Sequence, residues 1–83
     1  MNQIELMKVL KDKNGSYAVK EKWFLETGST LEDPEEVEAF HSIIEHIKEY
    51  GLMTEVVMST TEYFAEGNSF SLSLNCALGD WDL

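Results

Sequence analysis

The chain has 83 residues, of which 43% are hydrophobic and 11% aromatic, and its formal net charge is −10 at pH 7. This size predicts one globular domain over residues 1–83, and the apolar content is too high for an acidic disordered segment. The single cysteine excludes an intrachain disulfide, and no stretch approaches the roughly 20 apolar residues of a membrane span.

The charge is divided unevenly along the chain. Residues 1–30 hold five lysines and four acids, a net of +1, whereas residues 31–83 hold twelve acids and one lysine, a net of −11. Net charge bears on partners and solubility rather than on fold. The acidic part of the chain is therefore the first place to look for a contact surface.

The first predicted element is a short helix over residues 2–13, in which apolar residues mix with lysines and which Asn14-Gly15 would end. The lysines at positions 8, 11 and 13 interrupt the apolar run that a signal peptide needs, so we expect a cytoplasmic protein. Residues 16–27 fit a helix that Ser16 caps and Gly28 stops, and they also fit a strand that follows an Asn-Gly turn. We favour the helix.

Residues 34–50 carry the clearest helical pattern. Asp33 is a suitable N-cap, Pro34 suits the first helical position, and Gly51 suits the residue after the last turn. The apolar side chains follow helical spacing: Val37, Phe40, Ile43, Ile44, Ile47 and Tyr50. One side of this helix should pack on the core.

The C-terminal third fits two structures. With a period of two, residues 70–78 alternate apolar and polar side chains, and 54–64 would be the hairpin partner of this strand. With a period of 3.6, the segment forms two helices, for which Thr54 and Ser69 are the N-caps and Gly67 is the stop between them. The apolar stripe of the second helix then continues to Trp81, where the alternation has already ended. We predict an all-α, single-domain bundle of four to five short helices. The alternative is an α+β fold with a C-terminal β-hairpin that resembles a winged helix.

Acidic side chains gather opposite the apolar side of helix 34–50, because successive residues turn by about 100°. Like charges one turn apart destabilise a helix by a few tenths of a kcal/mol each, so such a row is either a solvated face or a contact surface for a basic partner. We select as candidate partner-binding residues Glu35, Glu38, Glu45 and Glu49 in the row, Glu32, Asp33 and Glu36 at its N-terminal end, Glu55 and Glu62 on the next segment, and Trp81 in the C-terminal tail.

Motifs for catalysis are weak. The chain has no phosphate-binding glycine loop and no nucleophile elbow. Glu38-x-x-His41 is half of a carboxylate-bridged di-iron signature, but the other histidine, His46, points about 140° away and lacks a matching glutamate. We expect a protein that is not an enzyme and that uses no metal or other cofactor.

The leading hypothesis is a non-enzymatic module that docks on a basic surface of a nucleic-acid-handling protein and blocks it, with carboxylates standing in for phosphates. In size and charge the chain is similar to small acidic inhibitors from viruses and mobile elements. Direct nucleic-acid binding is disfavoured because the chain has no arginine and its strongest helix is acidic. The alternative is a structural or regulatory subunit held by hydrophobic contacts, as a homodimer or with another protein.

Overall fold

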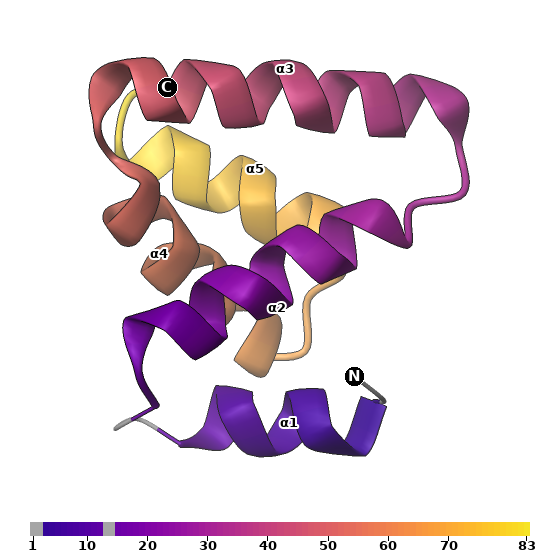
Figure 1. Cartoon of the computed structure of the whole chain (residues 1–83), viewed down its shortest axis with the longest axis vertical. Helices are drawn as coiled ribbons and strands as arrows, with labels where there is room; N and C mark the ends of the chain where they lie inside the picture. The colour runs from indigo at the N-terminus through magenta and orange to yellow at the C-terminus, as the bar shows by residue number, and fades with distance from the viewer. Residues whose placement is uncertain (1–2, 13–14) are drawn as a thin grey trace.

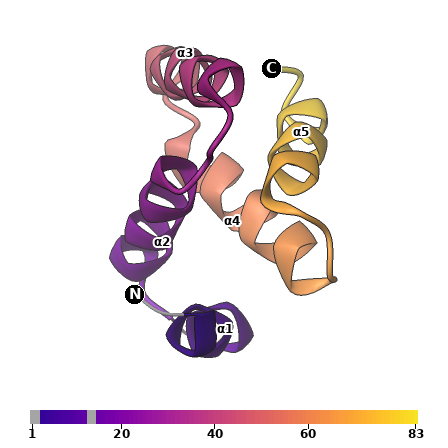
Figure 2. The same ribbon diagram turned by 90° about the vertical axis from the view of Figure 1, so that its right-hand side faces the viewer.

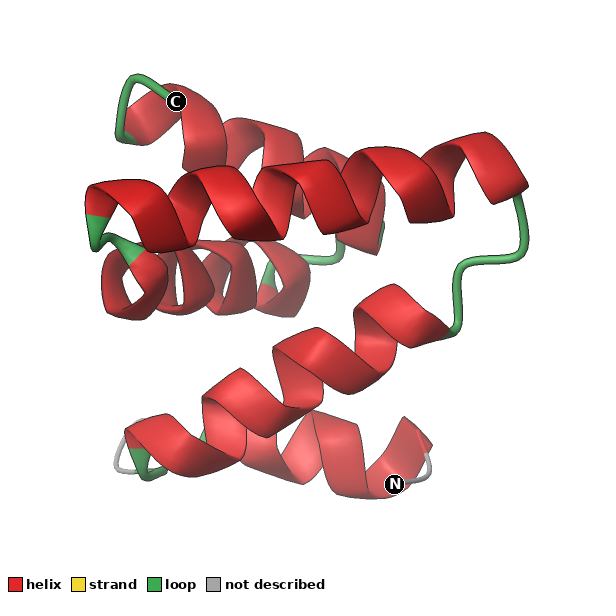
Figure 3. Ribbon diagram, turned by 45° about the horizontal axis from the view of Figure 1, so that its top comes forward, coloured by secondary structure: helices red, strands yellow, loops and turns green. Residues whose placement is uncertain are grey.

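The computed structural model describes residues 3–12 and 15–83. Within these residues the chain forms helices and no strand, as the ribbon coloured by secondary structure shows (Figure 3). The helices are α1 (Gln3–Lys11), α2 (Tyr17–Ser29), α3 (Pro34–Tyr50), α4 (Met53–Ala65) and α5 (Phe70–Asp80). The all-α prediction is confirmed, and the favoured helix near residues 16–27 is present as α2, with the Ser16 side chain accepting a bond from the Val19 amide.

The predicted alternative of a C-terminal β-hairpin is wrong, because its two strands are helices α4 and α5. The Ser69 side chain caps α5 by accepting a bond of 3.3 Å from the Leu72 amide. Ser73 is fully buried, and its hydroxyl donates to the Ser69 carbonyl at 2.7 Å. Two of the serines that gave the segment a strand-like alternation therefore form hydrogen bonds at the N-terminal end of α5, and the stripe with a period of 3.6 faces the core.

Helix α4 buries polar β-branched residues in the same way. The hydroxyls of Thr60 and Thr61 donate to the carbonyls of Val56 and Val57, each at 2.7 Å. Thr54 is not the N-cap that the sequence suggested. The helix begins one residue earlier, at Met53, directly after the turn that ends α3, and no side chain caps it.

Helix α3 has the ends that the sequence predicted. The Asp33 carboxylate accepts a bond of 3.0 Å from the Glu35 amide. Gly51 has φ +68°, and the amides of Gly51 and Leu52 donate back to the carbonyls of Lys48 and Ile47, which is a Schellman motif. The prediction that Tyr50 belongs to the apolar side of this helix is wrong, because Tyr50 is 61% exposed.

An aromatic cluster joins four helices at the centre of the molecule. Trp23 of α2 is fully buried, and its ring lies 5.3 Å from that of Phe64 on α4 and 6.1 Å from that of Phe70 on α5. Phe24 and Phe70 each lie within 6 Å of the Phe40 ring of α3, at 5.6 and 5.8 Å between centroids. Trp23 is therefore a central core residue.

Gly28 sets the distance between α2 and α3. The sequence suggested that this glycine ends α2, but the helix continues through Ser29 and Gly28 is buried inside it. A Cβ atom at this position would lie 2.0 Å from Cε1 of Phe40. The glycine is therefore needed for a close approach of the two helices and not for a turn.

Figure 1 shows how these contacts arrange the helices. Helix α3 lies along one edge of the molecule, α1 lies at the opposite edge, and α2, α4 and α5 fill the space between them. Figure 2, turned by 90°, keeps α3 and α1 at opposite ends. The most acidic helix is thus remote from the first, lysine-bearing one.

Candidate protein-binding surface

The predicted acidic row lies on the outer surface of α3. Glu35, Glu38, Glu45 and Glu49, called the acidic face from here on, are all exposed. Helix α3 meets the rest of the protein through its opposite side, where Phe40, Ile44 and Ile47 are buried. The helix therefore presents a long surface that no other described helix covers.

The charges of this surface are not neutralised locally. Residues 32–50 hold seven acids and one lysine, Lys48, a net of −6. Within the described part of the chain, no acid of α3 forms an ion pair within 4 Å, whereas Lys22 and Glu26 of α2 do, at 3.9 Å. Ion pairs within the described residues therefore do not offset the charge of the acidic face.

Three further predicted residues extend this surface at the N-terminal end of α3. Glu32, Asp33 and Glu36 are exposed there. Glu32 and Glu38 line a shallow, open depression along the flank of α3, together with Val37 and His41. The depression offers an apolar floor beside carboxylates, but it is too open to enclose a small molecule.

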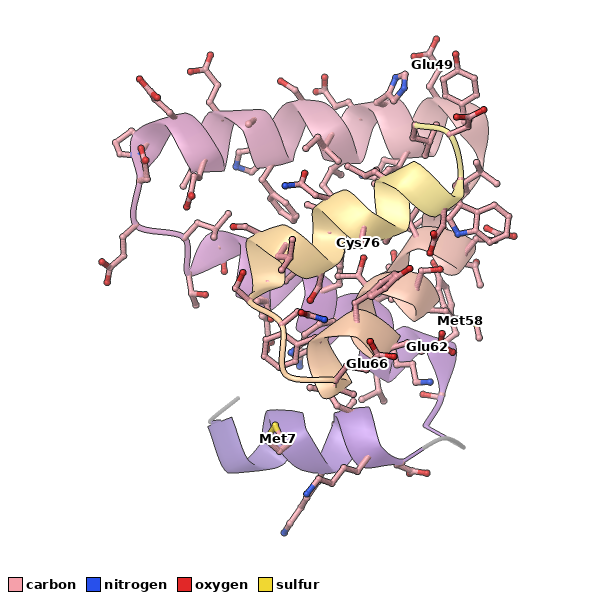
Figure 4. The ribbon with its side chains drawn as sticks, turned by 180° about the vertical axis from the view of Figure 1, so that it is seen from behind. Met7, Glu49, Met58, Glu62, Glu66 and Cys76 are labelled. Carbon is pink, nitrogen blue, oxygen red and sulfur yellow. The ribbon has the colours of Figure 1, made fainter. Side chains whose placement is uncertain are left out.

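The structure does not gather all the acids that the sequence proposed. Glu55 is only partly exposed, and its Oε2 atom is buried without a hydrogen-bond partner. Glu62 is exposed, but Figure 4 shows it near Glu66 on the part of α4 beside α1, whereas Glu49 lies on α3 at the far side of the molecule. Glu62 is therefore separated from the acidic face, because α4 runs away from α3.

The structure places Trp81 against α4. The side chain is 41% exposed, and its indole Nε1 donates to Ser59 Oγ at 3.1 Å. One turn further along α4, the hydroxyl of Tyr63 donates to Oδ2 of Asp80, the last residue of α5, at 2.7 Å. This bond raises the pKa of Tyr63 to about 12, since the carboxylate holds the phenolic proton. Trp81 is neither a core residue nor a free anchor, because it is half exposed and held by α4.

Sequence reasoning missed a groove between α3 and α5. It has a volume of about 160 Å³, and its lining includes Leu31, Phe40, Ile43 and Leu74. Each of these four residues is apolar, so the sequence alone would suggest that its side chain is buried. The groove arises from the separation of α3 and α5, which no local signal in the sequence encodes.

The described residues contain no group of three or more His, Cys, Asp or Glu side chains that could hold a metal ion. His41 and His46 are both exposed, and the His46 ring lies 4.8 Å from that of Tyr50. No helix in the described ranges combines the length and the apolarity needed to cross a bilayer. Comparison of the chain with known protein families, curated proteins and solved structures found no match.

Proposed function

We propose that this chain is a non-enzymatic protein-binding module whose acidic face docks on a basic surface of a nucleic-acid-handling protein and blocks it. The observation that carries the proposal is the row of exposed carboxylates along α3, which form no ion pair with another described residue. Nucleic-acid-binding proteins present the matching surface, because they bind phosphates with clustered lysines and arginines.

The clustering of glutamates in this row destabilises α3, and a row that served only solubility would not need to be clustered. Glu45 and Glu49 are one turn apart on the same exposed side, as are Glu35 and Glu38. Each such pair destabilises a helix by about 0.2–0.5 kcal/mol. A solvated surface gains as much from acids that are interspersed with lysines, which avoids this repulsion. A clustered row is therefore better explained by a partner that neutralises it.

The spacing of the carboxylates resembles a phosphate strand only in part. At a rise of 1.5 Å per residue, Glu35 to Glu49 spans about 21 Å and holds four charges, a mean separation of about 7 Å. One strand of B-DNA carries a phosphate about every 3.4 Å along its axis. The row has about half that density, so mimicry of nucleic acid would rest on competition for a basic groove and not on a copy of the phosphate positions.

A pull-down with two matched variants tests the proposal. Glu45→Lys/Glu49→Lys reverses two exposed glutamates one turn apart on α3, and Glu62→Lys/Glu66→Lys reverses an exposed pair four residues apart at the C-terminal end of α4, where Glu66 is the C-cap. Each variant raises the net charge from −10 to −6, because two charges of −1 become +1. Tagged wild type should capture a nucleic-acid-binding protein that moderate salt or added DNA releases. The α3 variant should lose this partner, and the α4 variant should keep it.

Equal capture by both variants would contradict the proposal, because only total charge would then matter. A partner that both variants retain through high salt would instead favour the alternative of a subunit held by hydrophobic contacts. The same salt series therefore separates the two functions.

A further inference from the structure

The shallow depression on the flank of α3 shares no lining residue with the groove between α3 and α5. Its lining contains half of the acidic face, Glu38 and Glu45, together with Glu32 from the turn before the helix. The apolar part of the lining is Pro34 and the half-buried Val37. The volume is about 530 Å³. Aliphatic carbon and carboxylates therefore lie side by side in one open hollow.

His41 adds an aromatic ring to this lining. It is exposed, and it lies three residues after Glu38 and four residues before Glu45, which is about one helical turn from each. The other histidine of α3, His46, lies five residues further on, a rotation of about 140°, and does not line the depression. One exposed histidine of the helix is thus placed among the carboxylates of the depression, and the other is not.

The charges of the depression favour a cation. Its lining holds three acids and no lysine, and none of these acids forms an ion pair with another described residue. Lys48, the only lysine of α3, lies outside the lining, three residues beyond Glu45. A cation that enters the depression therefore meets carboxylates to which no described lysine is paired.

An arginine side chain matches this lining better than a lysine side chain. The planar guanidinium donates two parallel hydrogen bonds to a carboxylate and stacks on aromatic rings, whereas the lysine ammonium is a compact, more strongly hydrated charge. The methylene stem of an arginine also covers apolar surface while its charged end stays among the acids. This chain contains no arginine, so a second copy of it cannot supply this side chain.

We propose that the depression beside His41 receives an arginine side chain of the basic partner, in preference to a lysine. This inference rests on the proposed function and adds the residue type that the partner inserts. The arginine stem covers Val37, and the guanidinium contacts Glu38 and Glu45. His41 then distinguishes the two cations, because a guanidinium stacks on an aromatic ring more favourably than an ammonium does.

The test uses two fluorescent, lysine-rich peptides of identical length and charge that differ at one central position, which is arginine in one and lysine in the other. In fluorescence anisotropy at low salt, wild type should bind the arginine peptide about two- to fivefold more tightly, as expected for one exposed contact between a cation and an aromatic ring. His41→Ala should remove this preference, because the carboxylates remain and the ring is lost. His46→Ala, at the other exposed histidine of α3, should keep the preference and is the matched control.

Two variants of equal charge test whether the depression holds the arginine. Glu38→Gln/Glu45→Gln removes the acids of the acidic face that line the depression, and Glu35→Gln/Glu49→Gln removes the two that do not. Each variant changes the net charge from −10 to −8, because two charges of −1 become 0. Both variants should weaken binding of the lysine peptide, and only the first should lower the preference for arginine.

Equal affinity of wild type for the two peptides would overturn this inference, and the proposed function would stand if both glutamine variants still weakened binding. A preference that survives His41→Ala, or that His46→Ala also removes, would place the arginine outside the depression and overturn the inference. Binding of neither peptide at low salt, or binding that neither glutamine variant weakens, would overturn both the inference and the proposed function. A wild-type dimer that Glu38→Gln/Glu45→Gln dissociates would overturn the inference in favour of a second copy.

Discussion

Replacing Glu38, Glu45 and Glu49 by glutamine should stabilise the fold while it weakens partner binding. The change removes two like-charge pairs, worth about 0.2–0.5 kcal/mol each, and one carboxylate from the last turn of α3, where the helix dipole disfavours it by about 0.3–1 kcal/mol. It also removes the favourable spacing of Glu45 and Lys48, worth about 0.2–0.5 kcal/mol. The net gain is about 1 kcal/mol, which corresponds to a rise in Tm of about 4–8 °C for a domain of this size.

Thermal unfolding followed by circular dichroism at low salt measures this gain. Glu21→Gln on α2 is the control, because no acid lies three or four residues from Glu21, and its Tm should change little. At about 1 M salt, where the Debye length is about 3 Å, the advantage of the triple variant should shrink. A triple variant that is less stable than wild type would refute the reasoning, since the glutamates would then stabilise α3 rather than repel one another.

Three further predictions test the fold around the surface. Gly28→Ala should destabilise the protein by about 1–3 kcal/mol in denaturant unfolding, because the new Cβ would lie 2.0 Å from the Phe40 ring. The stability that comes from the raised pKa of Tyr63 should be fully present below pH about 10 and be lost as the pH rises to about 12. Asp80→Asn should lower the pKa of Tyr63, which an ultraviolet titration of the phenol measures. Asp82→Gly should raise stability by about 0.5–1 kcal/mol, since Asp82 has φ +59° in the turn that ends α5; a lower Tm would contradict this.

The helices could be predicted wherever local chemistry specifies their ends. Asp33, Pro34 and Gly51 act within a few residues of themselves, so the bounds of α3 follow from the sequence. Gly28 shows the limit of this reasoning. A glycine near the end of a helical pattern usually indicates a stop, but here the tertiary contact with Phe40 determines its role, and that contact joins residues twelve positions apart.

The alternation in the C-terminal third was ambiguous for a different reason. Ser69, Ser73 and Thr60 have side chains that can bond to the backbone of their own helix, and the structure uses all three in this way. A polar side chain that is hydrogen-bonded to its own helix can occupy a buried position. Alternating polarity therefore does not by itself show that a segment is a strand. The stripe with a period of 3.6 was the better guide, because Phe70, Ser73, Leu74 and Ala77 are all buried.

The candidate surface was predictable only where it lies on one element. The acidic face follows from the period of a single helix, so its residues could be found from spacing alone. Glu62 could not be placed, because its position depends on the angle between α3 and α4. The groove could not be foreseen for the same reason, since Phe40 and Leu74 line it only because of where the fold places α3 relative to α5.

The fold turns the charge division of the sequence into a division in space. The acidic face lies on α3 at one edge of the molecule, and the exposed Lys8 and Lys11 lie on α1 at the other (Figure 1). A molecule with this polarity turns its negative edge towards a positive partner before contact, which raises the association rate and makes it depend on salt. Charge changes on α3 should therefore act mainly on the association rate of the proposed interface and little on its dissociation rate.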